Sequence, residues 1–149
     1  MKILAENRKA YFNYEILEKF EAGMVLAGYE VKSIKLGRAS LAGSYVVFKD
    51  GEPYLLNANV SPYQPKNMPK DYDSNRLRKL LLNKKEIKYL IGKSEQKGLT
   101  LAPLRMYIKG GKIKLEFGLA RGRKMFGKKE LLKKRDVEKE IERELKARG

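Results

Sequence analysis

The chain has 149 residues and a formal net charge of +16, from 34 lysines and arginines against 18 aspartates and glutamates. It contains neither histidine nor cysteine, which excludes disulfide bonds, thiolate metal sites and the side chain that most often serves as a general base. So large a positive charge favours a polyanionic partner such as RNA, DNA or an anionic membrane, and it indicates a binding protein rather than an enzyme.

Length and hydrophobicity predict one folded unit. Hydrophobic residues make up 42% of the chain, enough for a core, and 149 residues are few for two domains. No apolar run approaches the roughly 20 residues that span a bilayer. We therefore expect a cytoplasmic protein with no membrane partner, and the absence of cysteine fits a reducing compartment.

The first half of the chain carries strand signals. After a basic arm at residues 7–9, the segment 14–26 fits both a helical stripe and a strand face, but Gly23 and Gly28 disfavour a long helix and we favour a strand. The β-rich runs at 44–49 and 54–56 flank Asp50-Gly51, which is typical of a hairpin. Pro53 then starts the second strand or lies at a sheet edge.

A loop and a helix follow. Prolines 62, 65 and 69 predict a long surface loop over residues 61–75. Asn83 is expected to cap a helix, with Glu86 completing a capping box and Gly98 marking the stop. The buried stripe of this helix is Ile87, Leu90 and Ile91, and the preceding leucines 77, 80 and 81 are expected to form a short helix of their own.

The segments 99–108 and 112–119 form a second predicted hairpin across Gly110-Gly111. In its second strand, apolar residues 113, 115 and 117 alternate with the charged residues 112, 114 and 116. Two hairpins, a further strand and one or two helices indicate a mainly β fold, a small antiparallel β-barrel with helices packed on it.

The composition changes from Arg121 onward, where residues 121–149 hold 12 basic and 6 acidic side chains. Val137, Ile141 and Leu145 make a thin helical stripe that buries little by itself. We expect residues 1–124 to form the folded domain, and residues 125–149 to form a basic tail that is disordered alone and helical when bound.

Four basic clusters, at 7–9, 76–79, 84–85 and 121–124, are candidate phosphate contacts. A single cluster is more often a solvated surface, but four of them with a net charge of +16 favour nucleic-acid binding. Unpaired bases could stack on one or two of the tyrosines, most of which we expect in the core or at its rim: Tyr11, Tyr14, Tyr45, Tyr54, Tyr63, Tyr72, Tyr89 and Tyr107.

Glu21 and Glu30 could be interpreted as a general acid–base pair. No nucleophile or set of metal ligands accompanies them, so an RNA-processing enzyme is the least favoured interpretation. On a basic RNA-binding surface a carboxylate has another use, because it accepts hydrogen bonds from base N–H groups or 2′-hydroxyls. We expect no catalytic residue, metal or cofactor.

Several segments together carry a family resemblance. In chain order they are Asn7-Arg8-Lys9-Ala10, Glu21-Ala22-Gly23, Gly28-x-Glu30-Val31-Lys32-Ser33, Leu41-x-x-Ser44-Tyr45, Gly51-Glu52, Pro62-Tyr63, Arg76-x-Arg78-Lys79-Leu80-Leu81-Leu82, Lys85-Glu86-Ile87, Gly92-Lys93, Lys97-Gly98-x-Thr100-Leu101-x-Pro103-Leu104 and Gly122-Arg123-Lys124. This ordered set, which covers nearly the whole chain, resembles the small protein B family, the transfer-messenger-RNA-binding (SsrA-binding) proteins of bacterial trans-translation.

The resemblance implies an oligonucleotide-binding-type β-barrel with flanking helices. It implies an RNA-binding adaptor that binds the tRNA-like domain of transfer-messenger RNA and delivers it to stalled ribosomes, for peptide tagging and ribosome rescue. The tail would enter the decoding centre and the empty mRNA channel, and elongation factor Tu and alanyl-tRNA synthetase would be reached through the RNA. A generic ribosomal or translation-factor RNA-binding barrel is the alternative.

The resemblance assigns RNA binding to Glu21, Leu81 and Lys114, with Leu81 shaping the surface. With the basic clusters, the predicted RNA-binding set is Asn7, Arg8, Lys9, Glu21, Lys32, Arg76, Arg78, Lys79, Leu81, Lys114, Arg121, Arg123 and Lys124. The predicted ribosome-binding residues of the tail are Lys128, Lys129, Lys133, Lys134 and Arg135. The sequence departs from the family at Gly43 and Gly127, where many relatives carry aspartate, and Gly127 leaves the orientation of the tail on the ribosome open.

Overall fold

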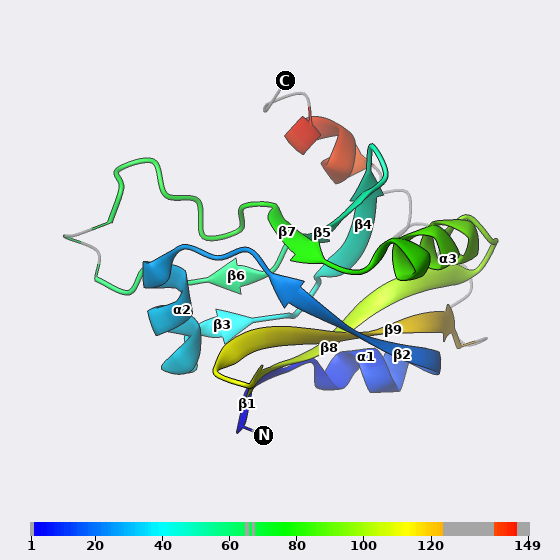
Figure 1. Ribbon diagram of the computed structural model, residues 1–149, viewed down its shortest axis with the longest axis horizontal. Coiled ribbons are helices and arrows are strands. Elements are labelled where there is room, and N and C mark those ends of the chain that lie inside the picture. The colour runs from blue at the N-terminus through cyan, green and yellow to red at the C-terminus, as the bar shows by residue number, and fades with distance from the viewer. Residues whose placement is uncertain (1, 65, 67, 124–138, 146–149) are drawn as a thin grey trace.

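The computed structural model describes residues 2–64, 66, 68–123 and 139–145 (Figure 1). Three helices are present in its body, α1 (Arg8–Asn13), α2 (Gly28–Lys35) and α3 (Lys84–Ser94). The strands are β1 (Lys2–Glu6), β2 (Tyr14–Met24), β3 (Ala39–Ser40), β4 (Tyr45–Lys49), β5 (Glu52–Leu56), β6 (Asn59–Val60), β7 (Arg78–Leu81), β8 (Leu99–Lys109) and β9 (Lys112–Gly122).

Seven strands form one antiparallel sheet in the order β1-β8-β9-β2-β7-β5-β4, and β3 pairs with β6 separately. Both predicted hairpins are confirmed, as β4–β5 and β8–β9, and the ambiguous segment 14–26 is strand β2. Pro53 lies just before Tyr54 and Leu55, the two residues of β5 that pair with β7. Its missing N–H therefore costs no hydrogen bond to β7.

The mainly β architecture with helices is confirmed, but the sheet is not a closed barrel. Strand β4 lies against β8, yet no ladder joins the two edge strands within the described residues. The edge of β8 is already occupied, by β1 from Arg105 to Ile108 and by Asn7 beside it. Asn7 donates its backbone N–H to the Leu104 carbonyl at 2.7 Å and its side-chain amide to the Pro103 carbonyl at 2.9 Å.

The two faces of the sheet are used differently. Ile113, Leu115 and Phe117 of β9 point into the main core, as their alternation predicts. On the opposite face, α1 packs Ala10 against Ala102, Leu104 and Ala120. Helix α1 covers only this end of the face, and among the described residues no other helix lies over the part formed by the first half of β9 and the second half of β2.

Glycine is required where α1 and the sheet meet. A Cβ atom on Gly118 of β9 would lie 2.8 Å from Cγ2 of Ile16 on β2, closer than carbon atoms approach without displacement. The register of the two strands shifts between Ile16 and Glu18, where a bulge curves the sheet around this contact.

The cap of α3 is confirmed, because Oδ1 of Asn83 accepts the backbone N–H of Glu86 at 2.8 Å. Leu90 is buried against the main core, and the helix ends at Ser94, before Gly98. The short helix expected at leucines 77, 80 and 81 is wrong, because this segment contains strand β7. In β7, Arg78 and Leu80 point inward and Leu81 points outward, an alternation fixed by pairing with β2 and β5.

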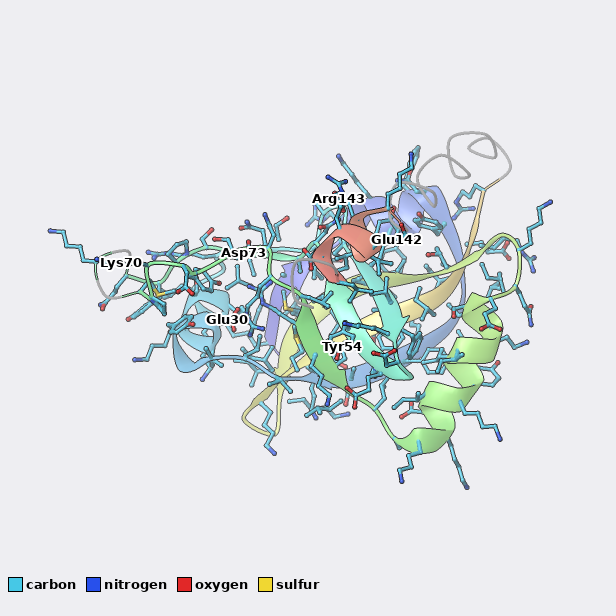
Figure 2. All side chains as sticks on the ribbon, turned by 90° about the horizontal axis from the view of Figure 1, so that it is seen from above. Glu30, Tyr54, Lys70, Asp73, Glu142 and Arg143 are labelled. Atoms are coloured by element: carbon cyan, nitrogen blue, oxygen red, sulfur yellow. The ribbon has the colours of Figure 1, made fainter. Side chains whose placement is uncertain are left out.

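A buried ionic network anchors β7 and the long loop before it. Glu30 and Arg78 are both 0% exposed, and Nε of Arg78 donates to Oε2 of Glu30 at 2.8 Å. Arg76 donates to the same carboxylate, as does the backbone N–H of Ala27 at 2.9 Å. Figure 2 shows Glu30 on α2, with Asp73 near the body and Lys70 at the outer end of the loop.

Residues 139–145 are helical and lie across the strands from α1 (Figure 1). The side-chain amide of Asn57, just after β5, donates to the carboxylate of Glu140. The remainder of the predicted tail, residues 125–138 and 146–149, lies outside the described residues. Among the residues that are described, none belongs to a helix with the length and apolar character to cross a membrane.

We expect Glu30→Gln to destabilise the fold by about 3 kcal/mol, because it leaves the buried guanidinium of Arg78 without a counter-charge. Burial alone raises the pKa of Glu30, but the hydrogen bonds from Arg76 and Ala27 and the charge of Arg78 lower it below the ordinary 4.5. A lowered pKa means that the stabilisation is present above pH 4.5 and is lost as the pH falls through the folded-state value. Denaturant unfolding at several pH values measures both effects.

The matched control is Glu52→Gln, which removes an exposed ion pair with Lys79 (3.2 Å between Oε2 and Nζ). This change should cost less than about 1 kcal/mol. Equal losses from the two variants would contradict an anchoring role for the buried network.

Candidate nucleic-acid interface

Three strands from distant parts of the chain meet at Gly23. Gly23 of β2 pairs with Leu81 of β7 on one side and with Lys114 of β9 on the other. Residues directly opposite in antiparallel strands point to the same face, and Glu21, two residues earlier on β2, shares that face. Glu21, Leu81 and Lys114 therefore lie together on the α1 side of the sheet, in the part that no described helix covers; we call this surface the sheet face.

The absence of a side chain at Gly23 shapes the sheet face. A Cβ atom there would lie 3.3 Å from Cβ and 3.4 Å from Cδ1 of Leu81, so Leu81 leans across β2 in the space that glycine leaves. Leu81 is 54% exposed, and the similarly exposed Val25 follows on β2, where its N–H donates to the Lys79 carbonyl. The result is a small aliphatic platform next to the charged residues of β9.

Glu21 is an oriented, ionised acceptor on the sheet face. The Tyr107 hydroxyl donates to its carboxylate, and Nζ of Lys109 lies 3.3 Å from Oε2. The hydrogen bond from Tyr107, aided by Lys109 and Lys114, holds the pKa of Glu21 below its ordinary value. Glu21 is therefore a carboxylate at neutral pH and can only accept hydrogen bonds.

A second carboxylate lies opposite Glu21, because Glu116 is its Cα partner across β2 and β9. Arg105 of β8 neutralises Glu116 with two contacts, of 3.1 and 3.3 Å, and its guanidinium lies 5.6 Å from the Tyr107 ring centroid. Cations border this acidic centre on every strand: Lys19, Lys79, Lys109, Lys112 and Lys114. Such an arrangement suits a ligand that presents hydrogen-bond donors in the middle and phosphates at the margin.

The basic surface continues towards α1. Arg8 and Lys9 are exposed on α1, and Arg123 is exposed just after β9. Arg121 is also exposed, but it follows Ala120 and pairs with the core residue Leu99, so it lies on the opposite face of the sheet. Arg123 donates to the carbonyl oxygens of Phe12 at 3.0 Å and Tyr11 at 3.2 Å, which joins β9 to the end of the helix. Nζ of Lys19, 5.7 Å from the centroid of the Tyr11 ring, lies between α1 and the sheet face.

Other predicted RNA-binding residues lie elsewhere. Asn7 is used to hold β8, and Lys79 pairs with Glu52 at the margin of the sheet face. Lys32 is exposed on α2, with its ammonium 5.6 Å from the centroid of the Tyr63 ring. Lys124 and the tail residues Lys128, Lys129, Lys133, Lys134 and Arg135 lie outside the described residues.

The prediction that Arg78 is a surface contact conflicts with its position. Its guanidinium is fully buried, and its other donors reach the Ala58 and Ser74 carbonyls at 2.8 and 3.1 Å. Arg76 joins the same network. Because both oxygens of Glu30 are bound within it, Glu30 does not pair with Glu21 as an acid and a base. In the part of the chain that is described, no three metal-ligating side chains come together.

Arg105 and Glu116 were not predicted as site residues, and Tyr107 was named only among the tyrosines expected to stack on bases or to lie in the core or at its rim. Arg105 and Tyr107 alternate with the buried Met106 in β8, so strand periodicity could have placed them on one face. They lie near Glu21 because β2 pairs with β9, and no local feature of the sequence specifies that pairing.

Known proteins resemble this chain over nearly its full length. Residues 4–147 match the family described as SmpB protein. An "SsrA-binding protein" of Carboxydothermus hydrogenoformans is 52% identical over 99% of this chain and 98% of its own length. Another, of Thermosynechococcus vestitus, is 49% identical over 99% of this chain and 97% of its own.

A solved structure has the same fold. It is described as "tmRNA-SmpB: a journey to the center of the bacterial ribosome", and one of its chains is 50% identical to this one. The TM-score is 0.68, with 83% of this chain and 86% of that chain covered. The sequence match, the shared fold and the sheet face agree, and the chain belongs to the SmpB protein family.

Proposed function

We propose that this protein is a non-catalytic RNA-binding adaptor of trans-translation. It binds the tRNA-like domain of transfer-messenger RNA and delivers it to stalled ribosomes, so that the nascent peptide is tagged and the ribosome is released. The observation that carries this proposal is the meeting of Glu21, Leu81 and Lys114 on the sheet face, in a chain that belongs to the SmpB protein family.

The sheet face has a separate group for each part of an RNA surface. Its bordering lysines bind phosphates, which makes the affinity dependent on salt. Glu21 accepts from a base N–H or a 2′-hydroxyl, a contact that a phosphate cannot replace. The platform of Gly23, Val25 and Leu81 offers apolar contact to a ribose or a base. The strands hold these groups in fixed relative positions, which favours one RNA shape over others.

The two parts of the chain have different partners. Residues 1–124 bind the RNA, with the cations beside α1 extending the surface. Residues 125–149 bind the ribosome, where the basic residues from Lys128 to Arg135 contact the decoding centre and the mRNA channel. Elongation factor Tu and alanyl-tRNA synthetase are reached through the RNA, and the setting is the bacterial cytoplasm. The thin apolar stripe of the tail favours a helix, and residues 139–145 within it are already helical.

Binding to the isolated tRNA-like domain and to an ordinary tRNA, measured at two salt concentrations, tests the adaptor function. We expect a preference for the tRNA-like domain that persists at the higher salt, because shape and hydrogen bonds are screened less than charge. Lys114→Glu should weaken binding to the tRNA-like domain by about tenfold. Lys88→Glu on the exposed side of α3 makes the same change in net charge and should have a small effect.

Equal affinity for the two RNAs, lost in parallel as salt rises, would contradict the adaptor function. It would instead support a generic ribosomal or translation-factor RNA-binding protein. Equal losses from the two charge reversals would show that only net charge matters.

Deletion of the tail from Lys128 onward should leave the affinity for the tRNA-like domain nearly unchanged and abolish peptide tagging on stalled ribosomes. The reason is that the sheet face and α1 lie wholly before the deletion. Filter binding measures the RNA affinity, and an in vitro assay measures peptide tagging. Lys114→Glu in the full chain is the comparison, because it should reduce RNA affinity directly. A large loss of RNA affinity on truncation would refute the division between the two parts.

A further inference from the structure

Tyr107 lies beneath the sheet face and is only 2% exposed. On strand β8 it pairs with Lys114 of β9 on one side and with Ile3 of β1 on the other. Its hydroxyl donates to Oε2 of Glu21, 86 residues earlier in the chain. Burial and this hydrogen bond raise the pKa of Tyr107 above its ordinary value, so the phenol remains a hydrogen-bond donor across the neutral range.

The two carboxylate oxygens of Glu21 have different partners. Oε2 accepts from Tyr107 and lies 3.3 Å from Nζ of Lys109, whereas Oε1 contacts only that ammonium, at 3.4 Å, among the described residues. The Glu21 side chain is 35% exposed. A ligand from the solvent side can therefore reach Oε1 while Tyr107 holds Oε2.

We propose that Tyr107 is a positioning residue, whose hydroxyl fixes the Glu21 carboxylate so that Oε1 accepts a hydrogen bond from RNA. The donor is a base N–H or a ribose 2′-hydroxyl, the two RNA groups with this chemistry. This inference rests on the proposed function of the sheet face.

The charge of the sheet face explains why Glu21 must be fixed. Glu21 and Glu116 are directly opposite; Arg105 forms an ion pair with Glu116, and the exposed Lys109 forms one with Glu21. A carboxylate in the middle of a basic surface repels phosphates, so it favours RNA binding only when it meets a donor at the right place. A glutamate side chain that is free to rotate loses rotamer entropy on binding, and the hydrogen bond from a buried phenol removes most of that cost before the RNA arrives.

The same contact predicts a pH effect. The ionisable groups around Glu21 on this face are Lys19 of β2, Arg105, Tyr107 and Lys109 of β8, and Lys114 and Glu116 of β9. Lys112 of β9 and Lys79 of β7 lie farther away on the same face. The Tyr107 hydrogen bond contributes most to the lowered pKa of Glu21. Its removal should raise that pKa, so that RNA binding is lost at a higher pH during acidification.

Tyr107→Phe removes the hydroxyl and keeps the ring under Arg105. We expect about a tenfold loss of affinity for the tRNA-like domain at neutral pH, and a higher pH for the acid-side midpoint of binding. In a Glu21→Gln background the same change should have little further effect, since Tyr107 acts through Glu21. The matched control is Tyr89→Phe, which removes the hydrogen bond from Tyr89 to Glu18 and should leave both readouts unchanged.

RNAs with single 2′-deoxy substitutions distinguish the two donors. If the donor is a 2′-hydroxyl, one deoxy substitution should weaken the wild-type complex and leave the Tyr107→Phe complex little changed. If no deoxy position does so, the donor is a base N–H. Either result supports a positioned acceptor, provided that Tyr107→Phe and Glu21→Gln are not additive.

Additive effects of Tyr107→Phe and Glu21→Gln, or an unchanged acid midpoint, would overturn the inference. If Tyr107→Phe fails to fold, Glu21→Asp tests the same point, because it keeps the charge and withdraws the carboxylate from the phenol; wild-type affinity in that variant would overturn it. If the wild-type protein binds no RNA, the proposed function fails. NMR titration of the Glu21 carboxyl in the free protein still tests the contact with Tyr107, and an ordinary pKa there would refute it.

Discussion

The pairing of β2 with β9 on one side and β7 on the other is the constraint on which the rest of the structure depends. It brings Glu21, Leu81 and Lys114 together from positions up to 93 residues apart, by their numbers in the sequence. It also fixes which face each side chain takes, because a shift of one residue in β2 would turn Glu21 inward and Ala22 outward. The sheet face therefore exists only in this register.

The buried network of Glu30, Arg76 and Arg78 secures the β7 side of that arrangement. Strand β7 has four residues and pairs with β2 at only two of them, so ladder hydrogen bonds alone hold it weakly. The inward-facing Arg78 joins it to α2 through Glu30 and to the loop through the Ser74 carbonyl. Removal of water from these charges is costly, but a single geometry satisfies their hydrogen bonds, and this geometry fixes the position of Leu81.

Local signals in the sequence predicted local structure well. Asp50-Gly51 and Gly110-Gly111 specify their hairpins by turn chemistry, and Asn83 specifies a helix start by its side-chain oxygen. Strand β7 was mistaken for a helix because its leucine spacing fits both periods, and what decides it is an ion pair with a residue 48 positions away. The site residues Glu21, Leu81 and Lys114 came from the family resemblance, since nothing local shows that they meet. The alternation of β8 could have predicted the face on which Tyr107 lies, but its role could not be predicted, because that role depends on contact with Glu21.

The proposed function requires that RNA bind at the sheet face. Backbone amide chemical shifts of the isotope-labelled full chain, recorded with increasing tRNA-like domain, locate the surface that RNA contacts. We expect the largest changes at residues 21–25, 79–81 and 105–116, extending to α1. Changes concentrated on α2 and on residues 61–75, with the sheet face unaffected, would contradict it.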